Sequence, residues 1–251
     1  MAEKHYTLAQ FPPWGLYFAE GLLDNKRVVP ERPGPHPCVV CGRAASALRF
    51  GPPHYVELVD VKRFGDYLYV YGQTDFGISE RFLGICEKEA VRGIEVVYPP
   101  IVVTRVGRRH REGRVPPVYH MVEIAREGAD LDDEASGVVR TKILCPRCRF
   151  GGVDAYQRIV LKPESDRGLD IFCVLGLPGD FIVSEKFVDM CVRHQISNTY
   201  FTPCEVATWD AYAKIEQPPD PPGVVIPVNP RSARAQARAE GRTAVDRRRK
   251  G

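Results

Sequence analysis

The chain has 251 residues, 44% of them hydrophobic and 27% charged, which is enough for one large domain or two small ones with a buried core. No stretch approaches the ~18–20 apolar residues of a membrane-spanning helix, and the first residues lack the pattern of a secretory signal, so we expect a cytoplasmic protein without membrane insertion. The net charge of +3 is uneven, because residues 231–251 carry eight basic and two acidic side chains and the rest of the chain is slightly acidic.

Four segments are expected along the chain. Residues 1–37 hold aromatic side chains among prolines and are predicted to form an N-terminal arm packed on the body. A first half (38–142) and a second half (143–217) each contain one Cys-x-x-Cys pair near the start. The run PPDPPG cannot continue a helix or a sheet, so residues 218–251 are predicted to be a proline-rich linker and a disordered basic tail.

The two halves repeat one sequence pattern. DFGISERFLGIC (75–86) and DFIVSEKFVDMC (180–191) are identical at six of twelve positions, and DYLYVYG (66–72) matches DIFCVLG (170–176) in pattern. The equivalent features lie 104 to 107 residues apart, and so do the two cysteine pairs. We therefore predict an internal duplication and an α+β fold, in which each half is a ββα unit that carries one zinc knuckle.

Each repeat has the local signals of strand, turn, strand and helix. The strand segments are rich in aromatic and β-branched residues. Ser79 and Ser184 are predicted helix N-caps, each followed by a glutamate that suits the helix dipole. Gly93 and Asn198 are predicted to adopt left-handed conformations after the helices. A further strand is expected after each helix, at 94–98 and 198–202.

The cysteines are the main candidates for a functional site. Eight cysteines without an export signal favour reduced thiols or metal over disulfides. A two-residue gap lets both thiolates of a pair bind one ion, while turn amides hydrogen-bond to the sulfur atoms. Two pairs would form a closed structural site for one Zn²⁺ per chain, with the ligands Cys38, Cys41, Cys145 and Cys148. Reduced thiols without metal, or a redox-active pair, are the alternatives.

The remaining thiols and histidines form no catalytic pattern. Cys86, Cys173 and Cys191 are predicted core residues, and Cys204 is assigned no role. The histidines are scattered, and His36 is predicted to be a surface or turn residue rather than a ligand. We find no nucleophile elbow, phosphate-binding glycine loop or HExxH motif, so we do not expect an enzyme.

The cysteine pairs, combined with the twice-occurring phrase F-x-(I/V)-S-E-(R/K)-F, resemble the double-CXXCG motif proteins of swarming soil bacteria. The resemblance covers about residues 36–205 and implies an immunity protein that binds and neutralises a cognate polymorphic toxin. The motif positions are Cys38, Cys41 and Gly42 in the first pair, and Cys145 and Cys148 in the second. Arg149 stands where the second motif has glycine, a change that is compatible with a knuckle if the backbone there is not left-handed.

The toxin-binding surface cannot be located from these patterns. One candidate is the acidic segment 127–134, within a predicted acidic loop at 125–136, because it would steer a basic toxin. Four basic residues near the cysteines either offset the negative charge of a four-thiolate site or are ordinary surface charges: Arg43, Lys142, Arg147 and Arg149.

The alternative function is a zinc-knuckle protein that binds nucleic acid or has a regulatory role, with the arginine-rich tail as its contact with phosphate groups. The acidic balance of residues 1–230 disfavours nucleic acid as a partner.

Overall fold

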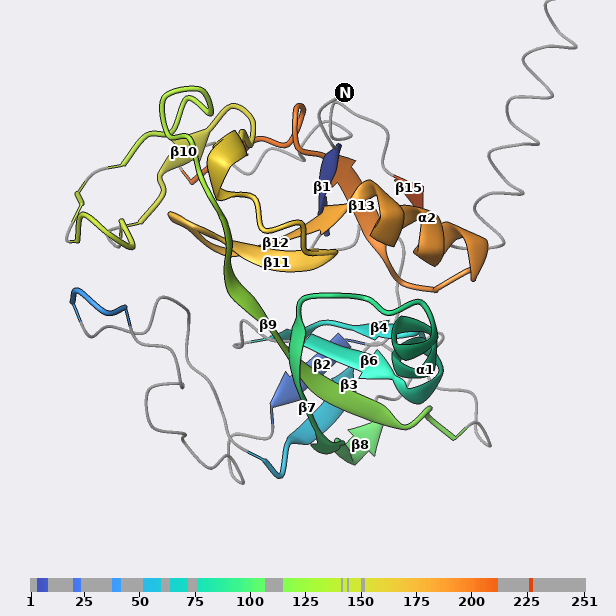
Figure 1. Cartoon of the computed structure of the whole chain (residues 1–251). Helices are drawn as coiled ribbons and strands as arrows, with labels where there is room; N and C mark the ends of the chain where they lie inside the picture. Colours follow the sequence, from blue (N-terminus) through green and yellow to red (C-terminus); the bar gives the residue numbers. More distant parts are fainter. Residues whose placement is uncertain are drawn as a thin grey trace, which may run out of the picture.

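The computed structural model describes residues 4–8, 20–23, 38–41, 52–59, 64–71, 76–106, 115–140, 142–143, 145–149, 152–211 and 226–227. Within these residues the protein is mostly β, with two α-helices beside a curled sheet (Figure 1). The helices are α1 (Glu80–Lys88) and α2 (Glu185–Arg193), and a 3-10 turn, η1, spans Pro163–Ser165. Strands therefore dominate more than the expected α+β class implied. The predicted basic tail and most of the predicted arm lie outside the described residues.

The large sheet has nine strands and carries both helices. Its members are β1 (His5–Leu8), β4 (Tyr67–Leu68), β6 (Phe76–Ser79), β7 (Ile94–Pro100), β9 (Tyr119–Asp130), β11 (Ile171–Leu175), β12 (Leu177–Ser184), β13 (Tyr200–Pro203) and β15 (Ile226–Pro227). The order is β15-β13-β1-β12-β11-β9-β6-β4, and β7 pairs with β9 beside this path. The pairing of β9 with β11 is parallel, and the other pairings in this sheet are antiparallel.

Two smaller sheets complete the described fold. The first has the order β5-β2-β3-β8, and the second pairs β10 with β14. Their bounds are β2 (Glu20–Leu23), β3 (Tyr55–Val59), β5 (Val70–Tyr71), β8 (Val102–Val106), β10 (Ala155–Tyr156) and β14 (Trp209–Asp210).

The prediction of an acidic loop at 125–136 is wrong for residues 125–130, because these residues belong to the strand β9. Residues 125–130 pair in parallel with β11, with Ala125 opposite Phe172 and Asp130 opposite Leu175. A Cβ at Gly128 would lie 2.3 Å from the Phe172 side chain, so a small residue is required for this close pairing. Three of the acidic side chains that suggested a loop pair with arginines around the candidate site described below: Glu127, Asp130 and Asp133.

The predicted N-caps of both helices are confirmed. The Ser79 hydroxyl accepts a hydrogen bond from the Phe82 amide at 3.1 Å, and the Ser184 hydroxyl accepts one from the Phe187 amide at 3.2 Å. Both serines have extended backbone conformations, as N-caps require.

The helices end earlier than predicted. Ala90 and Gln195, which directly follow the C-cap residues, have φ angles of 51° and 52°. Hydrogen bonds from the next amides back to Cys86 and Cys191 close the helix ends. Gly93 and Asn198 do have positive φ, but they lie further along the connecting loops.

Asp66, directly before β4, connects the start of α1 to the loop after α2. Its carboxylate accepts hydrogen bonds from the Ser197 amide at 2.9 Å and the Ser79 hydroxyl at 2.8 Å. It also pairs with Arg81 at 2.8 Å. A buried carboxylate with these donors holds the start of α1 close to the loop that follows α2.

Asp170 makes the corresponding contacts on the other side. Its carboxylate accepts hydrogen bonds from the Arg92 amide at 2.8 Å and the Ser184 hydroxyl at 3.3 Å, and it pairs with Lys186 at 3.2 Å. Arg92 follows α1, so Asp170 joins the start of α2 to the loop after α1, as Asp66 joins the start of α1 to the loop after α2.

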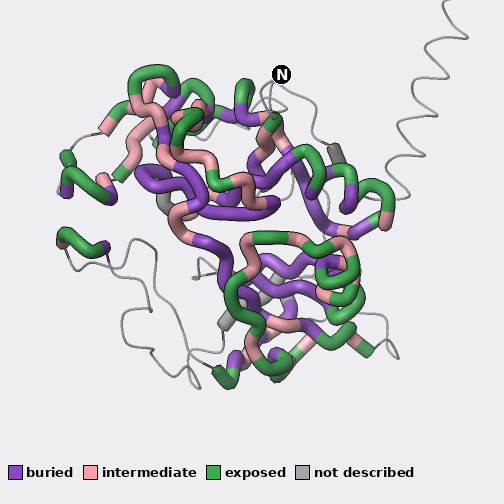
Figure 2. Tube along the Cα trace, viewed as in Figure 1, coloured by how far each residue is buried: buried purple, intermediate pink, exposed green. Residues whose placement is uncertain are grey.

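Burial follows the strands of the large sheet and the inner faces of the helices (Figure 2). The rings of Phe82 and Phe187 approach to 6.1 Å between centroids, so α1 and α2 share one core. The predicted core positions of three cysteines are confirmed, and Cys204 is buried as well: the three are Cys86, Cys173 and Cys191. Burial raises the pKa of the Cys86 thiol to about 12, which keeps it protonated.

Gly93 provides a test of this arrangement. Its φ is +113°, and a Cβ there would lie 1.8 Å from the carbonyl oxygen of Ile171. We expect Gly93→Ala to lower the free energy of unfolding by about 2 kcal/mol, because neither the backbone conformation nor the space suits a side chain. Gly84 on α1 has nothing within 4 Å of a Cβ, so Gly84→Ala should raise that free energy by up to ~1 kcal/mol. Urea unfolding measures both, and similar effects at the two positions would contradict the prediction.

Candidate metal centre

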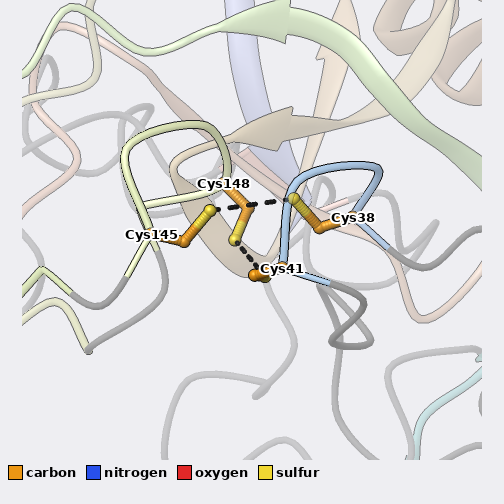
Figure 3. Close-up of side chains that lie close together, drawn as sticks. All are labelled: Cys38, Cys41, Cys145 and Cys148. Atoms are coloured by element: carbon orange, nitrogen blue, oxygen red, sulfur yellow. Dashed lines mark hydrogen bonds between the residues drawn. The ribbon is translucent and has the colours of Figure 1, made fainter.

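The structure brings the two cysteine pairs together (Figure 3). All four sulfur atoms lie within 4.8 Å of one another. The Sγ atoms of Cys38 and Cys145 are 3.8 Å apart, and those of Cys41 and Cys148 are 3.7 Å apart. These separations are far longer than the ~2 Å of a disulfide. They match the ~3.8 Å expected between two sulfur atoms around a tetrahedral ion with metal–sulfur bonds of about 2.3 Å. The cluster can therefore hold a metal ion.

Each pair lies on a tight turn whose amides point at the first sulfur of the pair. The amides of Cys41 and Val40 hydrogen-bond to the Cys38 sulfur and lower the pKa of its thiol to about 6. The amides of Cys148 and Arg147 act in the same way on Cys145, and they lower its pKa despite the opposing effect of burial. A lowered pKa favours the thiolate, which is the form that binds a metal.

The cluster is enclosed on the side of the large sheet. Cys38, Cys145 and Cys148 are buried against Leu175 of β11, and Cys41 is partly exposed. The tips of both turns face outward, as the exposed segments at the margin of Figure 2 show. Three residues considered in the sequence lie outside the described residues: His36, Gly42 and Arg43.

The second pair does not have the setting of a thioredoxin-like redox site. Such a pair sits at the start of a helix, whose dipole activates the thiol. Residues 146–148 form a turn, and the next described element is the strand β10. The sulfur cluster thus fits metal binding better than dithiol chemistry.

Arg149 ends the second turn in a left-handed conformation, with φ of 50°. Its amide donates a hydrogen bond to the Cys145 carbonyl at 2.9 Å, which closes the turn. From the sequence, an arginine at this motif position was expected to be compatible with a knuckle if the backbone is not left-handed. The backbone is left-handed, so this condition is not met. The turn nevertheless closes with arginine in this conformation, and Cys145 and Cys148 join the cluster.

The Arg149 side chain reaches back into the sheet and is only 14% exposed. Its Nη2 atom lies 2.5 Å from a carboxylate oxygen of Asp130 and 2.5 Å from the Leu175 carbonyl oxygen. A third contact, at 3.2 Å, is to the Leu131 carbonyl oxygen. The guanidinium group therefore links the second cysteine turn to the ends of β9 and β11.

Arg140 supports the same turn from the other side. Its guanidinium pairs with both carboxylate oxygens of Asp133 at 3.1 Å, and it donates to the Arg149 carbonyl at 3.4 Å and to the Gly176 carbonyl. The side chain is 4% exposed. Nothing in the sequence around Arg140 marks it as part of this site, because its partners are distant or lie in a segment predicted to be a solvated loop.

The acidic segment 127–134 is largely engaged in these contacts. Glu127 pairs with Arg147 at 3.0 Å, while Asp130 and Asp133 pair with the two arginines of the network. Three of its five carboxylates thus form ion pairs within the protein. Arg147 and Arg149 likewise pair with carboxylates, so their charges are not free to offset a four-thiolate site; Lys142 is exposed.

Fold and site together define a β-rich protein with a four-cysteine candidate metal centre, and no helix within the described residues is long and apolar enough to cross a membrane. The sequence model of the Immunity protein family (Imm11) matches residues 76–206, just over half of the chain, and the chain belongs to this family. The matched region contains both helices and the second cysteine pair. The family name supports the implied immunity protein, although it does not mention the double-CXXCG motif. Comparison with curated proteins gives no match.

Proposed function

We propose that this protein is a cytoplasmic immunity protein that binds a cognate toxin and neutralises it stoichiometrically. The observation that carries the proposal is the family match over residues 76–206, which contains both helices and most of the large sheet. Neutralisation by binding requires no reaction, because covering a toxin's active site is sufficient and protein interfaces reach the necessary affinity.

The proposal includes one structural Zn²⁺, held by Cys38, Cys41, Cys145 and Cys148. The sulfur spacing and the amides directed at Cys38 and Cys145 support this ligand set. Four thiolates leave no open position for a substrate, so the role of the ion is structural. Since the ligands come from segments 107 residues apart, the site would hold the first and second halves together.

We also propose that the halves 38–142 and 143–217 arose by internal duplication. The matching contacts of Asp66 and Asp170 support this idea, and so does the order of the strands. The order β7-β9-β6-β4 corresponds to β13-β1-β12-β11, with a helix after β6 and after β12. In this scheme β1, from the predicted arm 1–37, completes the second half.

The immunity function can be tested with the product of the gene adjacent to the one that encodes this chain. If that product arrests the growth of a heterologous host, co-expression of this protein should restore growth. The purified proteins should then elute together at a fixed stoichiometry in size-exclusion chromatography. An empty vector and an unrelated immunity protein are the controls. A toxic neighbour that arrests growth equally with and without this chain would contradict the proposal.

A further inference from the structure

We propose that Arg149, supported by Arg140, is a positioning residue of the metal centre, and that its guanidinium group fixes the second cysteine turn in the geometry that a metal requires. This inference rests on the metal site proposed above. It concerns why an arginine, rather than the glycine of the resembling motif, occupies this position.

The backbone of Arg149 is in a region that favours glycine, with φ of 50°. A side chain there is strained, whereas glycine adopts the same conformation without steric cost. An arginine at this place therefore needs contacts that offset the strain. Its charge-assisted bond to Asp130 and its bonds to the Leu131 and Leu175 carbonyl oxygens are such contacts.

The space for this guanidinium group is shaped by a second glycine. A Cβ at Gly176 would lie 2.1 Å from Nη2 of Arg149, so any larger residue there would displace the group. Gly176 also accepts a hydrogen bond from Arg140 through its carbonyl oxygen. Both arginines are mostly buried, at 14% and 4% exposure, whereas their partners Asp130 and Asp133 are 28% and 31% exposed. The guanidinium groups are thus less accessible to water than those of a surface ion pair.

The network acts on the cysteine cluster through two direct connections. Arg149 follows Cys148 in the chain, so anchoring its side chain anchors the turn that carries this thiol. The carbonyl oxygen of Leu175 accepts a hydrogen bond from Arg149. The side chain of the same residue packs against three of the cysteines, Cys38, Cys145 and Cys148. The turn is thereby held against β11 with its thiols already directed toward the first pair, which lowers the cost of ordering them on metal binding.

The test measures the affinity of the full chain for Zn²⁺ by competition with a chromophoric chelator, together with the absorption spectrum of the Co²⁺ form. Arg149→Gly restores the motif glycine and relieves the backbone strain. We nevertheless expect it to weaken metal binding by about tenfold to a hundredfold, the usual effect of removing a group that orients metal ligands. Arg193→Ala is the control, because it removes the same charge from an ion pair on α2 in which the arginine side chain is 57% exposed. It should change the affinity by less than about fivefold, as for an exposed ion pair.

The outcomes separate this inference from the metal site itself. A wild-type chain that binds neither Zn²⁺ nor Co²⁺ overturns the metal site, and this inference with it. A wild-type chain that binds, with Arg149→Gly binding as tightly or more tightly, overturns this inference alone. If circular dichroism shows that Arg149→Gly is unfolded, Arg149→Lys and Arg140→Lys carry the test. Arg140→Lys keeps the charge but loses the two-pronged contact with Asp133, and Arg149→Lys keeps the charge but loses the Nη2 group that contacts Asp130, Leu131 and Leu175. Unchanged affinity in both would overturn the inference.

Discussion

The Cys145→Ser/Cys148→Ser double variant should lose the metal ion and a large part of its thermal stability, whereas the wild-type chain should hold about one Zn²⁺. The variant removes one of the two pairs that meet within 4.8 Å. An ion that binds only the folded chain stabilises it by about 4 kcal/mol when its concentration is a thousand times Kd. For a chain of this size we expect the melting temperature to fall by roughly 10 °C.

Elemental analysis of the purified proteins and thermal unfolding measure the two effects. The Cys86→Ala/Cys191→Ala variant is the control, because it also removes two buried thiols but from the core between the helices. It should lower stability and leave the metal content unchanged. A wild-type chain that is metal-free and whose melting temperature does not respond to a strong chelator would refute the prediction.

Asp66→Ala should lower the free energy of unfolding by roughly 3–5 kcal/mol, because it leaves several buried donors without an acceptor. The amide of Ser197 and the hydroxyl of Ser79 both donate to this carboxylate, and they belong to segments more than 100 residues apart. Asp132→Ala is a suitable control. The Asp132 carboxylate accepts a hydrogen bond from the Ala135 amide at 3.0 Å on the protein surface, so its loss should cost only about 1 kcal/mol.

The effect of Asp66→Ala should depend on pH in a defined direction. Burial alone would raise the pKa of Asp66, but the hydrogen bonds from Ser197 and Ser79 and the charge of Arg81 hold it below its ordinary value. A carboxylate with a lowered pKa stabilises the fold at pH values above its unfolded pKa of about 4, and this contribution is lost as the pH falls through the folded pKa. The stability difference between wild type and variant should be constant above about pH 5 and shrink below pH 4. A difference that grows on acidification would count against the assigned contacts.

The elements set by local chemistry were predictable from the sequence. Ser79 and Ser184 cap helices because a serine hydroxyl can accept a hydrogen bond from the amide three residues later. This contact is local and does not depend on distant parts of the chain. The cysteine pairs were recognisable for the same reason, since their spacing fits a metal knuckle within five residues. A shared ion requires the fold to bring the two pairs together, which the sequence repeat favoured, and the sulfur atoms do lie close together.

The features missed in the sequence depend on partners far along the chain. The run after Ile124 was predicted to be a loop because it is acidic, but pairing with β11 makes it a strand. The carboxylates of Asp130 and Asp133 are compatible with this because Arg149 and Arg140 neutralise them. Neither pairing has a local signature, and a left-handed arginine contradicts the usual preference at its position.

The position of β1 has a consequence for the order in which the protein can fold during synthesis. Tyr6 pairs with Val183 on one side and with Pro203 on the other, so β1 is synthesised more than 170 residues before either of its partner strands. At ~5–20 residues per second, this interval lasts on the order of ten seconds or more. Strands β4, β6 and β9 can pair long before then. A ribosome-bound chain would thus carry paired strands β4, β6 and β9 together with β1, whose backbone groups still lack their partner strands. At this stage β1 is most able to pair with a strand of another nascent chain.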